Sequence, residues 1–343
     1  MSSFPTALPE SRSTPLRGGP TVRWGVLAPG GIANDFVTTL HANTDQRVAA
    51  VASRSPERAG AFAAKHGIPT VHASYEALVG DPGVDVVYIA APHSEHLALA
   101  LLAIGAGKHV LIEKPIAVSA DQAREIRAAA RATGVFAMEA MWSRFLPQSS
   151  VVAQLLEHGV LGEIGMVTAD FSVKFDFDPT GRAFDPALGG GALLDLGVYP
   201  TWFSHFVLGA PSAVTARGGL ASTGVDDQAV VTLEHAGGAI AAVTTSMRAQ
   251  GPVGASIAGT EGTLVYPTGF PGPAPFEVVS RGGARVAWQE TDGFQWRDGL
   301  CYQATAVAQY IADGLTESPI HSLQDSIEIL EVLDEARRQL GAR

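Results

Sequence analysis

The fold is decided by residues 22–53, VRWGVLAPGGIANDFVTTLHANTDQRVAAVAS. A short apolar run, a glycine-rich turn, an amphipathic stretch and a second apolar run follow one another in this segment. This order is typical of a βαβ unit, in which a helix connects two parallel strands. The segment therefore predicts a parallel sheet with helices packed against its faces.

The same alternation extends to about residue 146 and then stops. Beyond it, apolar and polar residues alternate with a period of two, which indicates antiparallel strands. We expect strands at 22–28, 47–53, 85–91, 109–113 and 135–140, and then at 165–175, 227–235, 238–247, 262–267, 276–280 and 284–290. We expect helices at 31–41, 56–66, 95–106, 119–133, 150–159, 190–209, 300–315 and 322–340.

These elements predict an α/β fold with two domains. Residues 21–146 are expected to form a doubly wound parallel sheet of the Rossmann type. Residues 147–343 are expected to form an α+β domain with a large, mostly antiparallel open sheet, which binds substrate and makes the oligomer contacts. Residues 1–20 hold four Pro and four Ser without apolar periodicity, and they predict a disordered tail.

The composition excludes several classes of protein. Hydrophobic residues make up 46% of the 343 residues, which excludes a disordered chain. A net charge of −11 argues against binding to nucleic acid or to an anionic membrane. The chain has no apolar run of the ~18 residues that span a bilayer and no signal-peptide pattern. With a single cysteine, Cys301, it is expected in the reducing cytoplasm.

The turn after the first expected strand is a candidate phosphate-binding site. Backbone N–H groups at a helix start attract an anion, so Ala28, Gly30, Gly31 and Ile32 are expected to contact a pyrophosphate. The match to the glycine fingerprint is imperfect, because Ala28 stands at the first glycine position and Pro29 lacks a backbone donor. On its own, the turn could also simply connect strand and helix.

The end of the second expected strand predicts the choice of cofactor. A site for NAD places a carboxylate there, against the ribose hydroxyls. This sequence has Ser53-Arg54-Ser55 instead, and a guanidinium group suits the 2′-phosphate of NADP. NADP is therefore expected to be preferred, with NAD possible. The alternative for Arg54 is a solvated turn residue.

Three residues combine the groups that proton transfer needs. Lys114 follows the strand at 109–113, so its ammonium group is expected at the carboxyl edge of the sheet, where open α/β sheets bind ligands. Asp195 and Tyr199 are four residues apart and are expected on one helical face. A phenol acts as an acid or base near neutral pH when an ammonium group lies close to it. These three are the candidate catalytic residues, with Asp195 orienting the other two.

Separated motifs resemble those of a known family. They are Trp24-Gly25, Glu113-Lys114-Pro115, residues 138–145 (MEAMWSRF), 190–199 (GGALLDLGVY) and 223–227 (TGVDD). In this order they resemble the glucose-fructose oxidoreductase, inositol dehydrogenase and MocA (Gfo/Idh/MocA) family, and within it the branch of dimeric dihydrodiol dehydrogenases and NADP-dependent xylose dehydrogenases. The resemblance covers residues from about 22 to 341.

The resemblance implies a nicotinamide-dependent oxidoreductase in which Tyr199 transfers a proton with the help of Lys114. It also implies a two-fold homodimer, or a dimer of such dimers, built by sheet-to-sheet packing. The remaining residues expected at the cofactor are Ala91, His93, His96, Glu113 and Lys114. The two histidines lack a third ligand at a suggestive spacing, so no metal site is expected.

The expected reaction is hydride transfer between nicotinamide and a sugar, at aldose C1 or another ring hydroxyl, or a cyclic trans-diol. Trp142, Phe171 and Phe294 are candidates to line the substrate pocket beside Tyr199, because an aromatic face stacks on a sugar ring. For Trp142, a place in the core is the alternative. The alternative function is a non-catalytic, NADP-sensing regulatory protein of the same fold, which the presence of both Lys114 and Tyr199 disfavours.

Overall fold

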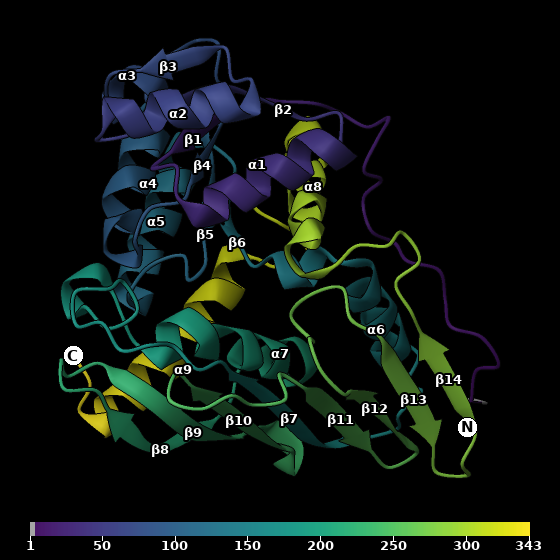
Figure 1. The fold of residues 1–343 in the computed structure, drawn as a ribbon. Coiled ribbons are helices and arrows are strands. Elements are labelled where there is room, and N and C mark those ends of the chain that lie inside the picture. Colours follow the sequence, from purple (N-terminus) through teal and green to yellow (C-terminus); the bar gives the residue numbers. More distant parts are fainter. Residues whose placement is uncertain (1–3) are drawn as a thin grey trace. The chain divides into compact units, whose positions relative to one another are not determined.

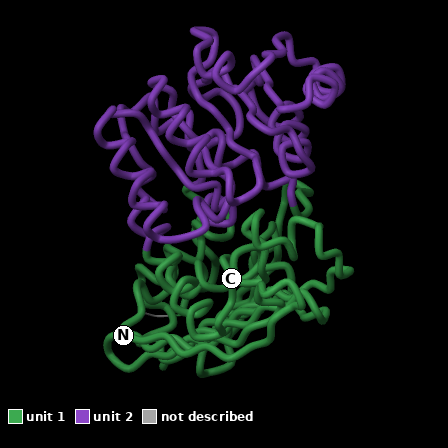
Figure 2. The backbone as a smooth tube through the Cα atoms, turned by 90° about the vertical axis from the view of Figure 1, so that its left-hand side faces the viewer, with its two compact units in different colours: residues 1–12, 146–296, 328–343 green, residues 13–145, 297–327 purple. Residues whose placement is uncertain are grey.

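The structure is a computed structural model that describes residues 4–343. The chain divides into two compact units, which are described separately (Figure 2). Unit 2 combines residues 13–145 with residues 297–327. Unit 1 contains residues up to 12, 146–296 and 328–343. None of the helices in the described part of the chain is long and apolar enough to cross a membrane.

Unit 2 is built on a parallel sheet that has six strands within the described residues. In spatial order the strands are β3 (Thr70–His72), β2 (Arg47–Ala52), β1 (Arg23–Leu27), β4 (Val86–Ile89), β5 (His109–Glu113) and β6 (Ala137–Ala140). This is the strand order of a dinucleotide-binding fold. The helices are α1 (Gly31–Asn43), α2 (Pro56–His66), α3 (Tyr75–Val79), α4 (His96–Gly105), α5 (Ala120–Thr133) and α8 (Leu300–Ala312).

Unit 1 is built on a mostly antiparallel sheet that has eight strands within the described residues. In spatial order they are β14 (Arg285–Trp288), β13 (Phe276–Ser280), β12 (Gly262–Tyr266), β11 (Ala255–Gly259), β7 (Ile164–Ser172), β10 (Ile240–Ser246), β9 (Asp226–Glu234) and β8 (Ala213–Leu220). The pair β7–β10 is parallel. The helices are α6 (Pro147–Glu157), α7 (Val198–Leu208) and α9 (Leu323–Leu340), of which α9 begins within unit 2.

The two faces of the unit 1 sheet differ in burial. Figure 1 shows α7 and α9 along one face of this sheet. The side chains that point to that face are buried, among them Val167, Val231 and Val243. The neighbouring positions along each strand point to the opposite face, among them Met166 and Val230. The predicted α/β fold, with a Rossmann sheet and a mostly antiparallel open sheet, is confirmed.

Two details differ from the predicted domain arrangement. The segment 297–327 clusters with unit 2, because α8 packs against α1 and Thr39 Oγ1 donates a hydrogen bond to the Asp298 carbonyl at 2.6 Å. The prediction of a disordered tail is wrong for residues 4–20; residues 1–3 lie outside the described residues. The Arg12 backbone donates to Ser150 Oγ at 2.8 Å within unit 1, and the Gly18 backbone donates to Asp45 at 2.8 Å within unit 2.

Candidate active site

The turn between β1 and α1 has the backbone of an anion site. Ala28 adopts a φ of 58°, the left-handed region that favours glycine, which explains why a glycine fits this position of the fingerprint. Gly30 is the N-cap of α1 and has no side chain with which to cap the helix. A Cβ atom on Gly31 would have no described atom within 4 Å. Gly30 and Gly31 are both exposed, so the start of α1, where unpaired backbone N–H groups favour an anion, is open to a ligand.

The residues that follow β2 have two different roles. Arg54 is exposed, and Ser53 Oγ accepts a hydrogen bond from the Ser55 backbone at 3.2 Å. Ser55 is the N-cap of α2, because its hydroxyl accepts from the Arg58 backbone at 3.2 Å and donates to Glu57 at 2.8 Å. Ser55 thus belongs to the start of α2, whereas the Arg54 side chain is exposed at the end of the strand.

His96 connects the segments that follow β4 and β5. It is fully buried, with Nδ1 at 2.9 Å from the Pro115 carbonyl and Nε2 at 3.0 Å from the Ala91 carbonyl. Its ring lies edge-on to that of His93, with 5.7 Å between the centroids. Burial lowers the pKa of His96. The buried ring of His96 thus lies between the segments that follow β4 and β5, and in its neutral form it donates a hydrogen bond to one of the two carbonyls.

Glu113 braces the backbone of Lys114. Its Oε1 accepts a hydrogen bond from the Tyr88 hydroxyl at 2.5 Å, and its Oε2 accepts from the Lys114 backbone at 3.3 Å. The Tyr88 ring stacks on Phe36, with 4.1 Å between the centroids. Burial raises the pKa of Glu113, and the bond from Tyr88 opposes that rise. The Lys114 side chain itself is half-buried at the end of β5.

In unit 1, Asp195 and Tyr199 lie on consecutive turns before and within α7. Asp195 belongs to a π-helical turn, η4 (Leu193–Gly197), which continues directly into α7. The expected regular helix over 190–209 is therefore wrong at its start. Such turns often occur at functional sites. The wider turn arises where Gly191, at a φ of 127°, leads into the helix beside the end of the sheet.

Arg182 holds the Asp195 carboxylate. Its two terminal nitrogens lie 3.0 Å from the two carboxylate oxygens, a bidentate ion pair that fixes the plane of the carboxylate. Asp195 is buried, whereas the Arg182 side chain is 45% exposed. The ion pair thus fixes the orientation of the Asp195 side chain just before α7.

Aromatic side chains surround Tyr199 in unit 1. The ring centroid of Phe171, at the end of β7, lies 5.2 Å from that of Tyr199 and 6.0 Å from that of Trp296. Phe294 is half-buried on the segment that leads to Trp296. In unit 2, Trp142 is 3% exposed and follows β6 at the carboxyl edge of the parallel sheet. Phe171 and Tyr199 are thus brought together, whereas Trp142 belongs to the other unit.

Sequence reasoning missed two residues of this arrangement, Arg182 and Trp296. Arg182 lies in a turn 13 residues before Asp195, and Trp296 begins the short 3₁₀ helix η6 (Trp296–Gly299), far along the chain from Phe171. Trp296 could have been identified as a candidate, because it is a tryptophan in a polar stretch of sequence, and its side chain is exposed in the structure. Arg182 is a single arginine before the glycine run 189–191, and nothing in the sequence around it indicates a functional role.

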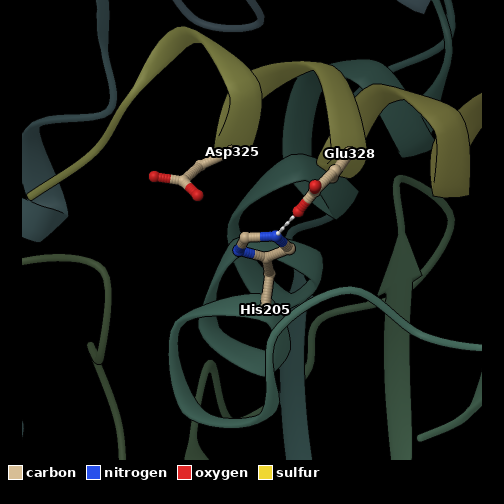
Figure 3. Close-up of side chains that lie close together, drawn as sticks. All are labelled: His205, Asp325 and Glu328. Carbon is tan, nitrogen blue, oxygen red and sulfur yellow. Dashed lines mark hydrogen bonds and ion pairs between the residues drawn. The ribbon is translucent and has the colours of Figure 1, made fainter.

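A second polar cluster lies on α7 and α9. His205 Nε2 lies 2.6 Å from a carboxylate oxygen of Glu328, and Asp325 lies one turn earlier on α9 (Figure 3). The Glu328 side chain is 25% exposed, so this is a half-buried ion pair that ties the two helices together. Asp325 also accepts a hydrogen bond from the Ser322 backbone at 2.7 Å, as a residue of the first helical turn.

Comparisons with known proteins cover both units. Residues 22–141 match the model of an oxidoreductase family with an NAD-binding Rossmann fold. Residues 150–265 match the model of the Gfo/Idh/MocA C-terminal domain. Trans-1,2-dihydrobenzene-1,2-diol dehydrogenase from Mus musculus is 39% identical over 328 residues, which are 93% of this chain and 97% of that protein. The protein of the same name from Danio rerio is 38% identical over 329 residues, again 93% and 97%.

Solved structures show the same fold. Levoglucosan dehydrogenase in complex with NADH and levoglucosan superposes with a TM-score of 0.85 at 21% identity, over 93% of this chain and 97% of that chain. At that identity the likeness shows the fold alone. A 3-ketoreductase from Actinomadura kijaniata in complex with NADP superposes with a TM-score of 0.80 at 28% identity, over 93% and 98% of the two chains.

Proposed function

This chain belongs to the Gfo/Idh/MocA family of nicotinamide-dependent oxidoreductases, and on that premise we propose that it transfers a hydride between NADP and a ring hydroxyl of a sugar or a cyclic trans-diol. The observation that carries the proposal is the pairing of Asp195 with Arg182 beside the aromatic residues around Tyr199. Aromatic faces bind a ring, and an oriented carboxylate accepts from its hydroxyls.

The chain's own residues supply binding and proton transfer. When bound, the nicotinamide accepts or donates the hydride. Tyr199 takes the proton of the reacting hydroxyl, or returns it in the reverse direction. The Lys114 ammonium group holds the substrate oxygen and favours the phenolate form of Tyr199. Asp195, fixed by Arg182, holds a neighbouring hydroxyl, so that the ring presents one carbon to the cofactor.

A panel assay tests this function. The chain is mixed with NADP or NAD and with aldoses, anhydro-sugars and aromatic trans-dihydrodiols, and the absorbance of reduced nicotinamide is followed. We expect turnover with at least one class of ring alcohol. Binding of the cofactor without turnover of any class would instead support the regulatory alternative.

NADP is the proposed cofactor because of the residues at the end of β2. Arg54 is exposed there and Ser53 is half-buried, so both can approach a 2′-phosphate. A carboxylate that would repel this phosphate is missing from the sequence Ser53-Arg54-Ser55. The open N-terminus of α1 accommodates the pyrophosphate.

Replacing Arg54 by alanine is expected to narrow the preference for NADP over NAD by ~10-fold to ~100-fold, since a hydrogen bond to a charged group contributes ~1.5–3 kcal/mol. Dissociation constants for both cofactors, measured by calorimetry, give the ratio. Arg54→Lys keeps the charge and should lose less. Arg124→Ala removes an exposed arginine from α5 of the same unit and is the control. Equal affinities for NADP and NAD in the unmodified chain would refute the assignment.

The cytoplasm is the proposed compartment. Cys301 is fully buried in α8, and its thiol lies 3.2 Å from the Asp298 carbonyl. Burial raises the pKa of Cys301 to about 12, so the thiol is protonated and unreactive at neutral pH. A chain with one such cysteine has no need of an oxidising compartment.

The open face of the unit 1 sheet is the proposed contact between two copies of the chain. Its exposed apolar residues, with the exposed fraction of each, are Met166 (50%), Val230 (53%), Ile240 (42%) and Val265 (37%). The strand register places all four on the face opposite α7. A face of this kind buries its apolar groups when it pairs with a second copy about a two-fold axis.

Replacing Val230 by lysine is expected to convert the dimer to a monomer, because the two-fold axis brings two new charges into one apolar contact. Analytical ultracentrifugation at micromolar concentration measures the mass. Val71→Lys is a matched control, since Val71 is 45% exposed on β3 of unit 2. A tetramer that falls to a dimer would indicate a dimer of dimers, and a monomeric unmodified chain would refute the proposal.

A further inference from the structure

Asp226 is a buried carboxylate that the reaction described above does not use. It is the first residue of β9 and is fully buried. Its Oδ2 accepts a hydrogen bond of 2.6 Å from the Leu193 backbone, the first residue of the π-helical turn that carries Asp195. Its Oδ1 has no hydrogen-bond partner among the described residues. Asp226 therefore connects β9 directly to the start of the π-helical turn.

Gly191, which precedes the π-helical turn, lies directly against the Asp226 carboxylate. A Cβ atom on Gly191 would lie 2.6 Å from Asp226 Oδ1, and Gly191 has a φ of 127°. Both observations require glycine at this position. The carboxylate consequently occupies the space that a side chain at 191 would need, and the backbone passes close over it before the turn begins.

Thr245 of β10 lies beside the same turn. Its hydroxyl lies 3.0 Å from the Phe171 carbonyl and 3.4 Å from the Ala192 carbonyl. A Cβ atom on Gly197 would lie 3.3 Å from Thr245 Cγ2. Residues of two neighbouring strands, Asp226 of β9 and Thr245 of β10, thus hold the start of the π-helical turn, and Tyr199 follows two residues after its end.

We propose that Asp226 is a positioning residue, whose carboxylate fixes the turn that presents Asp195 and Tyr199 in the geometry that proton transfer needs. This inference rests on the function proposed above. A displacement of ~1 Å in a catalytic group can lower the rate ~100-fold, so the bond to Leu193 has a large effect on turnover without any contact to substrate.

The charge of Asp226 has a cost in stability. Burial raises its pKa to about 6, whereas the Leu193 N–H and Arg337 of α9 favour the ionised form and Asp227 of β9 opposes it. Because the carboxyl binds its proton more tightly in the folded chain, stability decreases as the pH rises from the unfolded pKa towards 6. The Tm of Asp226→Asn, relative to the unmodified chain, is therefore expected to rise between pH 5 and pH 8. A pH-independent difference would contradict titration of Asp226 in this range.

Amide hydrogen exchange tests the anchoring without substrate or cofactor. Asp226→Ala removes the acceptor, and exchange of the amides in 193–199 is expected to become ~10-fold to ~100-fold faster, the range that a hydrogen bond to a charged group supports. Asp227→Asn is the matched control, because Asp227 is also buried but lies beside Arg248, at 3.6 Å. Equal exchange in the Asp226→Ala variant and the control would overturn the proposal.

Turnover tests the positioning role. Asp226→Asn and Asp226→Ala are expected to lower kcat by ~10-fold and ~100-fold, with unchanged affinity for NADP. In a chain that already carries Tyr199→Phe, the same changes should lower kcat by less than ~3-fold, because the two residues act through one step. Equal losses in both backgrounds would mean a merely structural role and would overturn the proposal. If Tyr199→Phe alone leaves kcat unchanged, the proton-transfer role of Tyr199 fails, and if the unmodified chain turns over no ring alcohol, the proposed function fails; the exchange experiment still decides the anchoring in both cases.

Discussion

Replacement of Tyr199 by phenylalanine is expected to lower kcat by ~10²-fold to ~10⁴-fold, the contribution of general acid–base catalysis. The change removes one hydroxyl and keeps the ring that packs against Phe171 at 5.2 Å. The fold and the affinity for NADP should therefore be unchanged. Stopped-flow absorbance of reduced nicotinamide measures the rate, and calorimetry measures the affinity.

Tyr266→Phe is the matched control for this experiment. Tyr266 is a buried tyrosine of unit 1, on β12, whose ring packs against Phe276 with 5.2 Å between the centroids. Loss of its hydroxyl should leave kcat within a factor of ~2, as for a change away from the reacting groups. Near-normal turnover in Tyr199→Phe would move the proton-transfer role to Lys114, His93 or His96.

Replacement of Lys114 by methionine is expected to be at least as damaging, again ~10²-fold to ~10⁴-fold in kcat. It removes both the contact to the substrate oxygen and the charge that favours phenolate at Tyr199. The pH profile of kcat in the oxidation direction is the second measurement, because its acidic limb, where Tyr199 must lose its proton to act as a base, should shift to higher pH without the ammonium group. The double variant should lose much less than the product of the two single effects.

Lys108→Met is the control at the opposite end of β5. Lys108 precedes β5, and its ammonium group donates to the Asp81 and Val84 carbonyls at 2.7 and 2.8 Å. Its loss should lower the Tm and leave kcat unchanged. Unchanged activity in both Tyr199→Phe and Lys114→Met would remove the whole catalytic assignment.

Much of the fold could be predicted because it rests on local patterns. The helix expected at 56–66 is α2, which begins with Pro56 after a serine N-cap and ends before Gly67 in the left-handed conformation. The strand expected at 109–113 is β5. The missed strand β8, AVTARGGL, lacks apolar alternation. A Cβ atom on its Gly218 would lie 2.1 Å from the Gln228 carbonyl, so close approach of two backbones replaces the usual side-chain pattern.

The site was predictable where a residue follows directly from its own strand or helix. Lys114 follows β5 directly. Asp195 and Tyr199 follow the glycine run 189–191, which can be seen in the sequence. Arg182 and Asp226 depend on contacts across 13 and 33 residues, which no local period encodes. The π-helical turn likewise depends on how Gly191 and Gly197 fit against β9 and β10. Tertiary packing decides these features.

Unit 2 can be completed only late in protein synthesis, because the chain leaves this unit after residue 145 and returns to it with residues 297–327. The Arg297 guanidinium group lies 2.6 Å from Asp35 on α1, and the Ala137 backbone donates to the Thr316 carbonyl at 3.0 Å. A ribosome must therefore have made almost the whole chain before α1 and β6 receive these partners. A gene fragment that ends near residue 145 would leave α1 without the cover of α8 and Thr39 without its bond to Asp298.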